Sequence, residues 1–376
     1  MIWVWVGFVT LVLALLALDL LVLNRKAHEV TMREAAKWTT LFVLVGAGFA
    51  GAVYTIYSRD VGGLGTRYLE RYAKAPPRAE PAVPIETGRT PPPAPDAASA
   101  PEAREAPIVL TPETISLGAK SATLEYLTGW IVEYSLSMDN IFVIALIFGH
   151  FRVPAKHQHR VLFWGIMGAL ILRGVMIGAG AILVERFGWI LYLFAAFLIY
   201  AGLKIIFTKD DESFDPEKSP VYRLARRAFP FTTRYDEQRF FTMEEGKRVA
   251  TPLLLVLLLV ESTDVVFAVD SIPAIFSITK DPFLVFSSNA FAIMGLRSLY
   301  FLLAGAMHKF ELLKYSLSFI LIFVGFKMLA EHWFHTPAWL SLSIVVLALA
   351  VGLVGSLVQS RGKPPPPPPE TPTGAS

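Results

Sequence analysis

The chain has 376 residues, of which 54% are hydrophobic and 17% charged, and it contains no cysteine. Its mean hydropathy of +0.51 is too high for an ordinary soluble protein and indicates a membrane protein with many spans. The lack of cysteine excludes disulfides, thiolate metal sites and thiol redox chemistry. The formal net charge is only +3 and the basic residues lie in separate loops, so we expect no nucleic-acid partner.

Apolar runs recur along the chain, and each is long enough to cross a lipid bilayer as a helix of about 20 residues. The first run is interpreted as an uncleaved anchor, because no positive segment precedes it and the run is longer than that of a signal peptide. The sequence therefore predicts an all-α polytopic membrane protein of about nine transmembrane helices, with spans at 2–23, 38–58, 122–148, 161–184, 189–207, 251–278, 283–306, 315–330 and 338–358.

Lysine and arginine collect in alternate short loops, and loops of that kind are cytoplasmic. The pattern predicts a multi-pass protein of the cell (inner) membrane, with its N-terminus outside and its C-terminus in the cytoplasm. The basic loops contain Arg25, Lys26, Arg33 and Lys37, then Arg152, Lys156 and Arg160, then Lys309 and Lys314, whereas the alternate loops contain only Arg186 and Lys280.

Three segments lack a predicted span. Residues 59–120 include PPPAPDAASAPEAREAP and are interpreted as an extracytoplasmic linker, because they offer little apolar surface to pack. Residues 209–250 are interpreted as a cytoplasmic connection that forms a small surface helix or an ordered loop. The tail at 361–376 is polyproline-like and predicted to be disordered. A protein partner docking on the linker or the tail is one interpretation, and a plain spacer is the favoured one.

The stretch EYSLSMDNIF, which begins at Glu133, aligns with DVVFAVDSIP, which begins at Asp264. The alignment pairs two carboxylates with two others and continues through the next two spans. It matches Glu133 with Asp264, Asp139 with Asp270, Asn140 with Ser271, Arg173 with Arg297 and Lys204 with Lys327. The chain thus divides into two spans (1–58), the linker, repeat A (121–208), the cytoplasmic connection, repeat B (251–333), a last span (334–360) and the tail.

Each repeat has three spans, so the second copy enters the membrane from the opposite side, as in the inverted repeats of secondary transporters. The two acidic helices then run antiparallel, which puts Glu133 level with Asp270 and Asp139 level with Asp264, about 9 Å apart at 1.5 Å rise per residue. Six residues turn a helix by about 240°, so either a helix bends or the two levels are used by different partners. Pro273 cannot donate to the carbonyl of Val269, which frees that oxygen beside Asp270 and Ser271, as in broken helices that line ion sites.

Charged groups at mid-membrane depth are costly, and they mark ion or proton pathways. Glu261, three residues before Asp264, adds a fifth carboxylate on nearly the same face. One interpretation is that the acids only pair with the four matched bases and lock the helices together. The favoured one is that the acids bind an ion while Arg173, Arg297, Lys204 and Lys327 act as counter-ions or gating groups.

The candidate ligands are all hard oxygen donors: Glu133, Asp139, Asn140, Glu261, Asp264, Asp270 and Ser271. Such a set suits Mn²⁺, Mg²⁺ or Ca²⁺, and the seven histidines lie at span ends or in loops. The metal is expected as transported substrate, with no cofactor. Asp19 in the first span is a further ligand or gate residue, the alternative being a group that caps or pairs near the cytoplasmic end.

Four segments carry a resemblance to a known family: LDLLVLNRKAHEV, LTGWIVEYSLSMDNIFVIALIF, HQHRVLFWGIMGALILR and the run from ATPLLLVLLLVESTDVVFAVDSIP to IMGLRSLYFLL. Over roughly Leu18 to Trp38 and Thr114 to Ala330 the chain resembles the TerC family of integral membrane proteins. The resemblance implies a lysine-exporter-like transporter fold, a family name linked to tellurium resistance, and members that export Mn²⁺. The family's acidic motifs fall on the seven ligands named above, and the long linker departs from the family.

We therefore expect an exporter of divalent cations, Mn²⁺ first, coupled to protons because carboxylates that bind a metal must lose them. The alternative is a non-transporting membrane scaffold in tellurite or metal stress, or one that helps to metalate secreted enzymes. No nucleophile–base pair or nucleotide motif is present, so no enzyme activity is expected. The bilayer and the metal ion are the expected partners.

Overall fold

The computed structural model describes residues 2–18, 31–73, 111–207, 219–303 except Gln238, 312–330 and 337–360. Within these ranges it leaves out the side chains of Asp139, Asp270, Leu313, Leu357 and Ser360. The described chain is almost entirely helical, and the predicted all-α membrane fold is confirmed.

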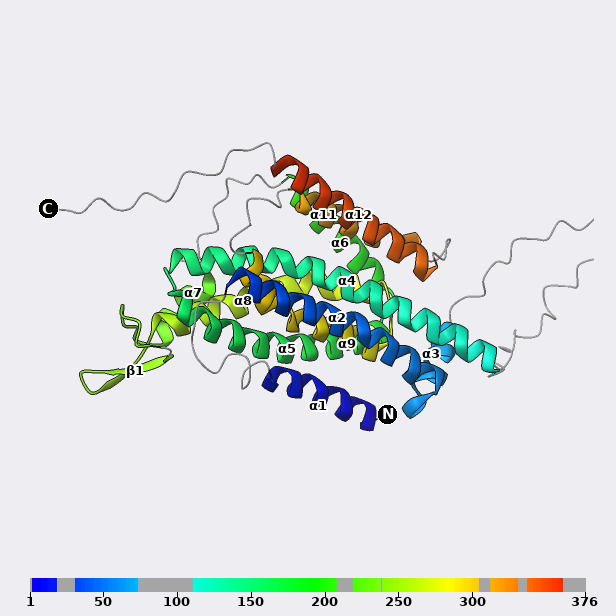
Figure 1. The fold of residues 1–376 in the computed structure, drawn as a ribbon, viewed down its shortest axis with the longest axis horizontal. Helices are drawn as coiled ribbons and strands as arrows, with labels where there is room; N and C mark the ends of the chain where they lie inside the picture. The colour runs from blue at the N-terminus through cyan, green and yellow to red at the C-terminus, as the bar shows by residue number, and fades with distance from the viewer. Residues whose placement is uncertain are drawn as a thin grey trace, which may run out of the picture.

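The helices form one elongated bundle, in which α4 runs nearly its full length and α6, α11 and α12 group on one side (Figure 1). α7 and a small hairpin lie at one end of the bundle, whereas η2 and α3 lie at the other. The elements are α1 (Ile2–Leu18), α2 (Met32–Ser58), the 3-10 turn η2 (Val61–Gly63), α3 (Leu64–Ala73), α4 (Pro112–His150), α5 (Ala155–Arg186), α6 (Ile190–Phe207), α7 (Pro220–Ala228), β1 (Phe241–Glu244), β2 (Lys247–Ala250), α8 (Pro252–Phe276), α9 (Pro282–Met294), α10 (Leu296–Leu303), α11 (Leu313–Ala330) and α12 (Ala338–Ser360).

Each of the nine predicted spans corresponds to a helix or a broken helix. Within the described ranges, six helices are long and apolar enough to cross a membrane, and the pair α9 and α10, bent by 40°, makes a seventh. The described residues thus contain six or seven of the expected nine spans. The two remaining predicted spans correspond to α1, of which 17 residues are described, and to α11, of which 18 are described.

Helix starts follow short polar signals in the sequence. Thr111 and Thr114 form a reciprocal capping box at the start of α4, and Asp281 accepts from the backbone N–H groups of Phe283 and Leu284 at the start of α9. A proline fills the first helical position in both, where a missing N–H costs nothing.

The segment interpreted as a linker, residues 59–120, contains helices at both of its ends. Its first part folds as η2 and α3, its last part belongs to α4, and 74–110 lies outside the described residues.

The two repeats pack as an antiparallel pair around an approximate two-fold axis. α4 packs on α9 and α5 on α8, while α6 packs on α11. A Cβ on Gly202 would lie 2.9 Å from the Ser318 backbone oxygen, and one on Gly325 would lie 2.8 Å from that of Ala195. Gly202 and Gly325 are matched positions of the repeat, and each carbonyl oxygen lies seven residues before the matched glycine. The contact is therefore symmetric, as the alignment predicts.

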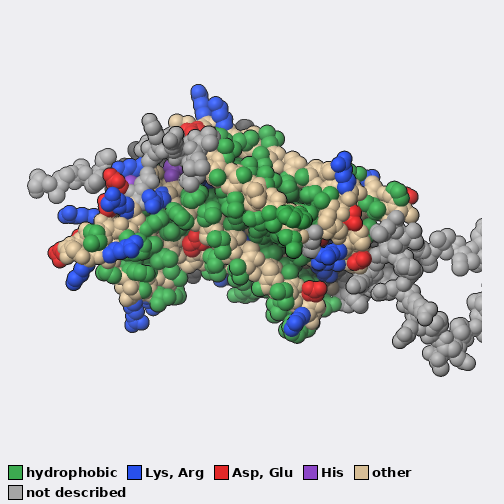
Figure 2. Space-filling model, turned by 90° about the horizontal axis from the view of Figure 1, so that it is seen from below, with side chains coloured by type: hydrophobic (Ala, Val, Ile, Leu, Met, Phe, Trp, Pro, Cys, Tyr) green, Lys and Arg blue, Asp and Glu red, His purple; other side chains and the backbone are tan. Residues whose placement is uncertain are grey.

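The connection between the repeats contains the expected helix, α7, and a hairpin that was not predicted. β1 and β2 pair antiparallel through Glu245 and Gly246, both with positive φ, as a tight hairpin turn requires. In the space-filling view, charged side chains gather at the two ends of the molecule and apolar side chains cover the middle (Figure 2), which fits a membrane-spanning bundle.

Candidate functional site

Arg173 of α5 is the centre of the candidate site, and its side chain is only 1% exposed. Its guanidinium pairs with Glu133 of α4 and with both carboxylate oxygens of Asp264 on α8, at 3.2 Å from Nε and 2.9 Å from Nη2. Its Nη1 also lies 3.5 Å from the hydroxyl of Ser271. One buried arginine thus ties together the acidic helices of the two repeats.

A second contact sets the register of α4 against α8. The amide of Asn140 donates to Asp264 at 3.4 Å, while Arg173 links Glu133 to Ser271. Residue numbers fall along α4 as they rise along α8, so the two helices run antiparallel. The end of each motif lies level with the start of the other, as the inverted repeat predicts.

Glu261 joins the same region from one turn before Asp264. A Cβ on Gly168 of α5 would overlap the Glu261 carboxylate, so only glycine lets α5 approach the acid this closely. The sequence analysis did not single out Gly168. A glycine five residues before a mid-span arginine could have indicated a close approach between helices at this level. Thr263 was also missed, and its hydroxyl is bound to the Val260 carbonyl at 2.8 Å.

A small cavity lies beside Asp264. It has a volume of about 30 Å³ and is lined by Asn140, Thr263 and Asp264 together with apolar side chains of α4, α5, α8, α9 and α10. That volume is sufficient for one water-sized particle, since such a site needs about 10–15 Å³.

Among the candidate ligands whose side chains are described, three on α4 and α8 carry a buried oxygen atom without a donor. Within the described residues, Oε2 of Glu133, Oδ1 of Asn140 and Oε2 of Glu261 have no hydrogen-bond partner. A buried oxygen left unpaired costs about 1–3 kcal/mol, and more when it is charged. Three such atoms from two antiparallel helices therefore favour a cationic occupant.

The other predicted site residues have different outcomes. Asp19 lies outside the described residues, as do the side chains of Asp139 and Asp270. Arg297 is buried next to the break between α9 and α10. Lys204 is exposed in the last turn of α6 and Lys327 half-buried in the last turn of α11, and their role as counter-ions or gating groups stays a prediction.

α8 runs as one unbroken helix from Pro252 to Phe276, with Pro273 inside it. Pro273 lies in the last turn, where it removes a single backbone hydrogen bond. The break lies instead at Gly295 in repeat B. A Cβ there would lie 3.2 Å from the ring of Tyr134, so glycine allows α4 to pack directly on the break.

No group of three or more His, Asp or Glu side chains meets at metal-ligand spacing among the side chains that the structure describes. That search leaves out Asp139 and Asp270.

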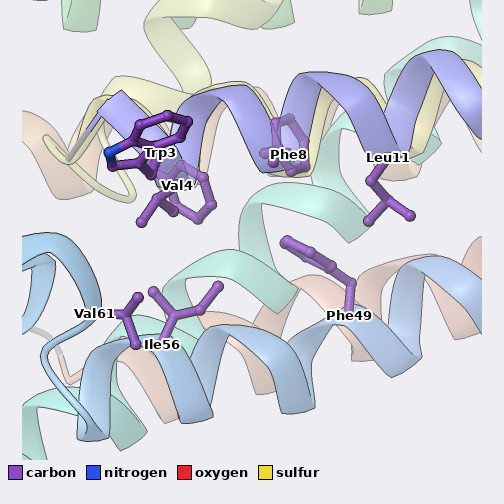
Figure 3. Close-up of a pocket in the computed structure, with 9 residues that line it drawn as sticks. Trp3, Val4, Phe8, Leu11, Phe49, Ile56 and Val61 are labelled. Atoms are coloured by element: carbon purple, nitrogen blue, oxygen red, sulfur yellow. The ribbon is translucent and has the colours of Figure 1, made fainter.

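A larger cavity of about 340 Å³ lies between α1 and α2 (Figure 3). Its lining is apolar, with Trp3, Phe8 and Leu11 facing Phe49 and Ile56, so it offers no ligand to an ion.

Comparisons with known proteins agree with this architecture. The family model "Integral membrane protein TerC family" matches residues 119–363. The chain is 41% identical over 360 residues to "Uncharacterized membrane protein STKORF319" of Myxococcus xanthus, covering 96% of this chain and 93% of that protein. It is 40% identical over 342 residues to "Putative membrane-bound redox modulator Alx" of Escherichia coli K12, covering 91% and 90%. No solved structure matches the chain.

Proposed function

Because this chain belongs to the TerC family of integral membrane proteins, we propose that it is a transporter that exports divalent metal cations, Mn²⁺ first among them. The transported ion binds at mid-membrane between the two repeats. The observation that carries this proposal is the set of buried oxygens without donors on Glu133, Asn140 and Glu261, together with a small cavity beside Asp264 that Asn140 also lines. Carboxylate and amide oxygens are the donors that Mn²⁺, Mg²⁺ and Ca²⁺ prefer.

Arg173 acts in this proposal as the counter-ion of the empty site. Glu133, Asp264 and Glu261 supply three formal negative charges, and Arg173 balances one of them. An entering divalent cation supplies the two positive charges that remain missing, so the arginine is free to release its carboxylates. Carboxylates that bind a metal must be deprotonated, which couples cation export to protons moving the other way. By the repeat, Asp139, Asp270 and Ser271 complete the ligand set.

The proposed location is the inner membrane, with the N-terminus outside and the C-terminus in the cytoplasm. An antibody or a thiol reagent should then reach an epitope or a cysteine introduced after Ala97 from outside intact cells. It should reach one introduced after Glu237 only after permeabilisation. The opposite labelling would contradict this orientation, and with it the proposed direction of export.

The name of the Escherichia coli relative describes it as a redox modulator. Any redox role of the present chain does not use thiols, since it has no cysteine. A non-transporting scaffold is the remaining alternative, in metal stress or in metalation of secreted enzymes.

Liposomes test transport against the scaffold alternative. Purified protein is reconstituted in vesicles loaded with a Mn²⁺-sensitive dye, and an outside-acid or outside-alkaline pH step is applied. We expect Mn²⁺ flux whose rate depends on the pH gradient and is lost in Asp264→Asn. Protein that inserts in the vesicles yet moves no Mn²⁺ in either gradient would refute the transporter.

A further inference from the structure

A second group of buried charged and phenolic side chains lies at the end of the bundle where α2 ends and α4 begins. We call it the outer cluster, and it consists of Tyr57, Tyr68, Arg71, Glu125 and Asp281. Its members come from α2, α3, α4 and the loop before α9, so both repeats contribute. The two carboxylates are 5% and 4% exposed, and the proposed transport site does not use them.

The carboxylates of the outer cluster are held from several directions. The Tyr68 hydroxyl donates to Oε1 of Glu125 at 2.7 Å. Oδ1 of Asp281 accepts from the backbone N–H of Phe283 at 2.9 Å, and its Oδ2 lies 3.6 Å from Nη1 of Arg71. Burial raises the pKa of the Asp281 carboxyl, while Arg71 and the backbone N–H groups oppose that rise. Hydrogen bonds and Arg71 therefore hold both carboxylates in place, although burial disfavours the charged form of Asp281.

Tyr57 supplies the observation that points to a ligand. Its side chain is 1% exposed, and within the described residues its hydroxyl has no hydrogen-bond partner of ordinary geometry. Asp281 lies close enough to accept a hydrogen bond of poor geometry from that hydroxyl, and Glu125 acts on it electrostatically. A hydroxyl that is buried beside carboxylates and lacks a bond of ordinary geometry keeps oxygen lone pairs that a further partner can use.

The outer cluster and the proposed transport site lie at two levels of the same helix, α4. Glu125 precedes Glu133 by eight residues of the same helix, which is about 12 Å of axial rise. Between those levels α4 meets α9 closely, since a Cβ on Gly129 would lie 3.2 Å from the Ser288 hydroxyl. The next residue on α9, Asn289, is buried, and its amide nitrogen has no partner among the described groups. The two acidic levels are therefore joined by small and polar side chains.

We propose that the outer cluster is a second binding site for a hard divalent cation, on the release side of the transport path, and that Arg71 balances its charge while it is empty. This inference rests on the proposed function. Two carboxylate groups and two phenolic oxygens form an all-oxygen donor set of the kind Mn²⁺ accepts. The Arg71 side chain is 43% exposed, so it can swing away into solvent when a cation arrives.

Mn²⁺ binding to the full-length purified protein tests the proposal by equilibrium dialysis, which gives both stoichiometry and affinity. The variant Glu125→Gln with Asp281→Asn removes both charges and keeps the acceptor for Tyr68 and the helix cap. Glu113→Gln, an exposed acid in the first turn of the same helix, is the matched control. We expect two Mn²⁺ per chain in the unaltered protein and in the control, and one in the double variant. Asp264→Asn should keep the outer ion.

Arg71→Gln provides a readout that a purely structural role would not move. Removing a nearby positive charge strengthens cation binding, so outer-site affinity should rise several-fold, and Tyr57→Phe should lower it. An unchanged or weaker outer affinity in Arg71→Gln would refute the inference. One Mn²⁺ per chain, lost in Asp264→Asn and kept in the double variant, would refute the outer site and leave the transport site standing. No Mn²⁺ bound by the unaltered protein would refute both.

Discussion

Two interfaces between the repeats differ in how well they keep the internal symmetry. Where α6 meets α11, Gly202 and Gly325 make the same contact from opposite sides, each against a backbone carbonyl of the other helix. Where α4 and α5 meet α8, the matched positions differ: one arginine, Arg173, lies in a continuous helix, and its counterpart Arg297 lies beside a break.

The difference indicates that the α6–α11 contact serves packing, whereas the charged residues of α4, α5 and α8 have different roles in the two copies. Close helix packing through small residues depends on shape alone, and shape is preserved when a unit is duplicated and inverted. The charged positions are not held to that symmetry, because the two matched arginines lie in different helix settings, one in a continuous helix and one beside a break. The two copies therefore diverge at Asn140 and Ser271 and in the helices that bear the arginines, while the α6–α11 contact stays the same.

The largest effect is expected at Asp264, which contacts both Arg173 and Asn140. Asp264→Asn removes one buried charge and should reduce Mn²⁺ transport about 1,000-fold, since losing one partner of a buried charged group costs up to about 4 kcal/mol. Flux in liposomes is the measurement, with Glu113→Gln as the control. Equal flux in Asp264→Asn and the control would remove Asp264 from the site.

Arg173→Gln should act on stability and not only on transport. It leaves Glu133 and Asp264 facing each other without a counter-ion, at a cost of about 3 kcal/mol for the metal-free protein. Added Mn²⁺ replaces the lost charge, so Mn²⁺ should raise the melting temperature of Arg173→Gln more than that of the unaltered protein. A smaller Mn²⁺ effect in the variant would make Arg173 a helix-locking residue, in line with the structural interpretation.

Gly168→Ala tests the position of Glu261 without changing a charge. The added methyl overlaps the carboxylate and pushes it from the site, and a ligand displaced by even part of an ångström should lower Mn²⁺ affinity about tenfold. Gly178→Ala on the same helix is the matched control, because nothing lies within 4 Å of a Cβ there. The idea fails when both variants bind Mn²⁺ equally well.

Most of the fold could be predicted because it follows from local signals. Apolar runs set the helices, proline and threonine mark their starts, and the aligned motifs give the antiparallel register of α4 and α8. The break at Gly295 could not be predicted this way. A proline can be recognised in the sequence because it removes a backbone hydrogen bond. Gly295 is needed because the Tyr134 ring packs against it. That contact joins residues far apart in sequence, so no local signal predicts it.

The candidate site was predictable by residue type and only partly by contact. Charges at mid-span singled out Glu133, Asp264 and Arg173, since each costs free energy in a bilayer. The same reasoning assigned Lys204 and Lys327 as counter-ions or gating groups, and they lie in the last turns of α6 and α11. Near a helix end a lysine can extend toward the membrane surface, so its place in the sequence does not fix its depth.

The smallest effect, and the one that tests the symmetry directly, is expected at the α6–α11 contact. A Cβ on Gly202 would lie 2.7 Å from the Ile322 side chain, and one on Gly325 would lie 2.7 Å from that of Ile199. Alanine at either position forces the helices apart by a few tenths of an ångström, which costs about 1–2 kcal/mol of overpacking. Gly48→Ala on α2, where a Cβ meets nothing within 4 Å, is the control.

Because the two contacts are matched by the repeat, Gly202→Ala and Gly325→Ala should lower the melting temperature by equal amounts and leave Mn²⁺ affinity unchanged. The double variant should cost less than the sum of the two, since a gap opened by one methyl already makes room for the other across the same short contact. Unequal single effects, or a shift in Mn²⁺ affinity, would mean that this interface is coupled to the charged site. The α6–α11 pair would then move with the transported ion rather than serve as its fixed frame.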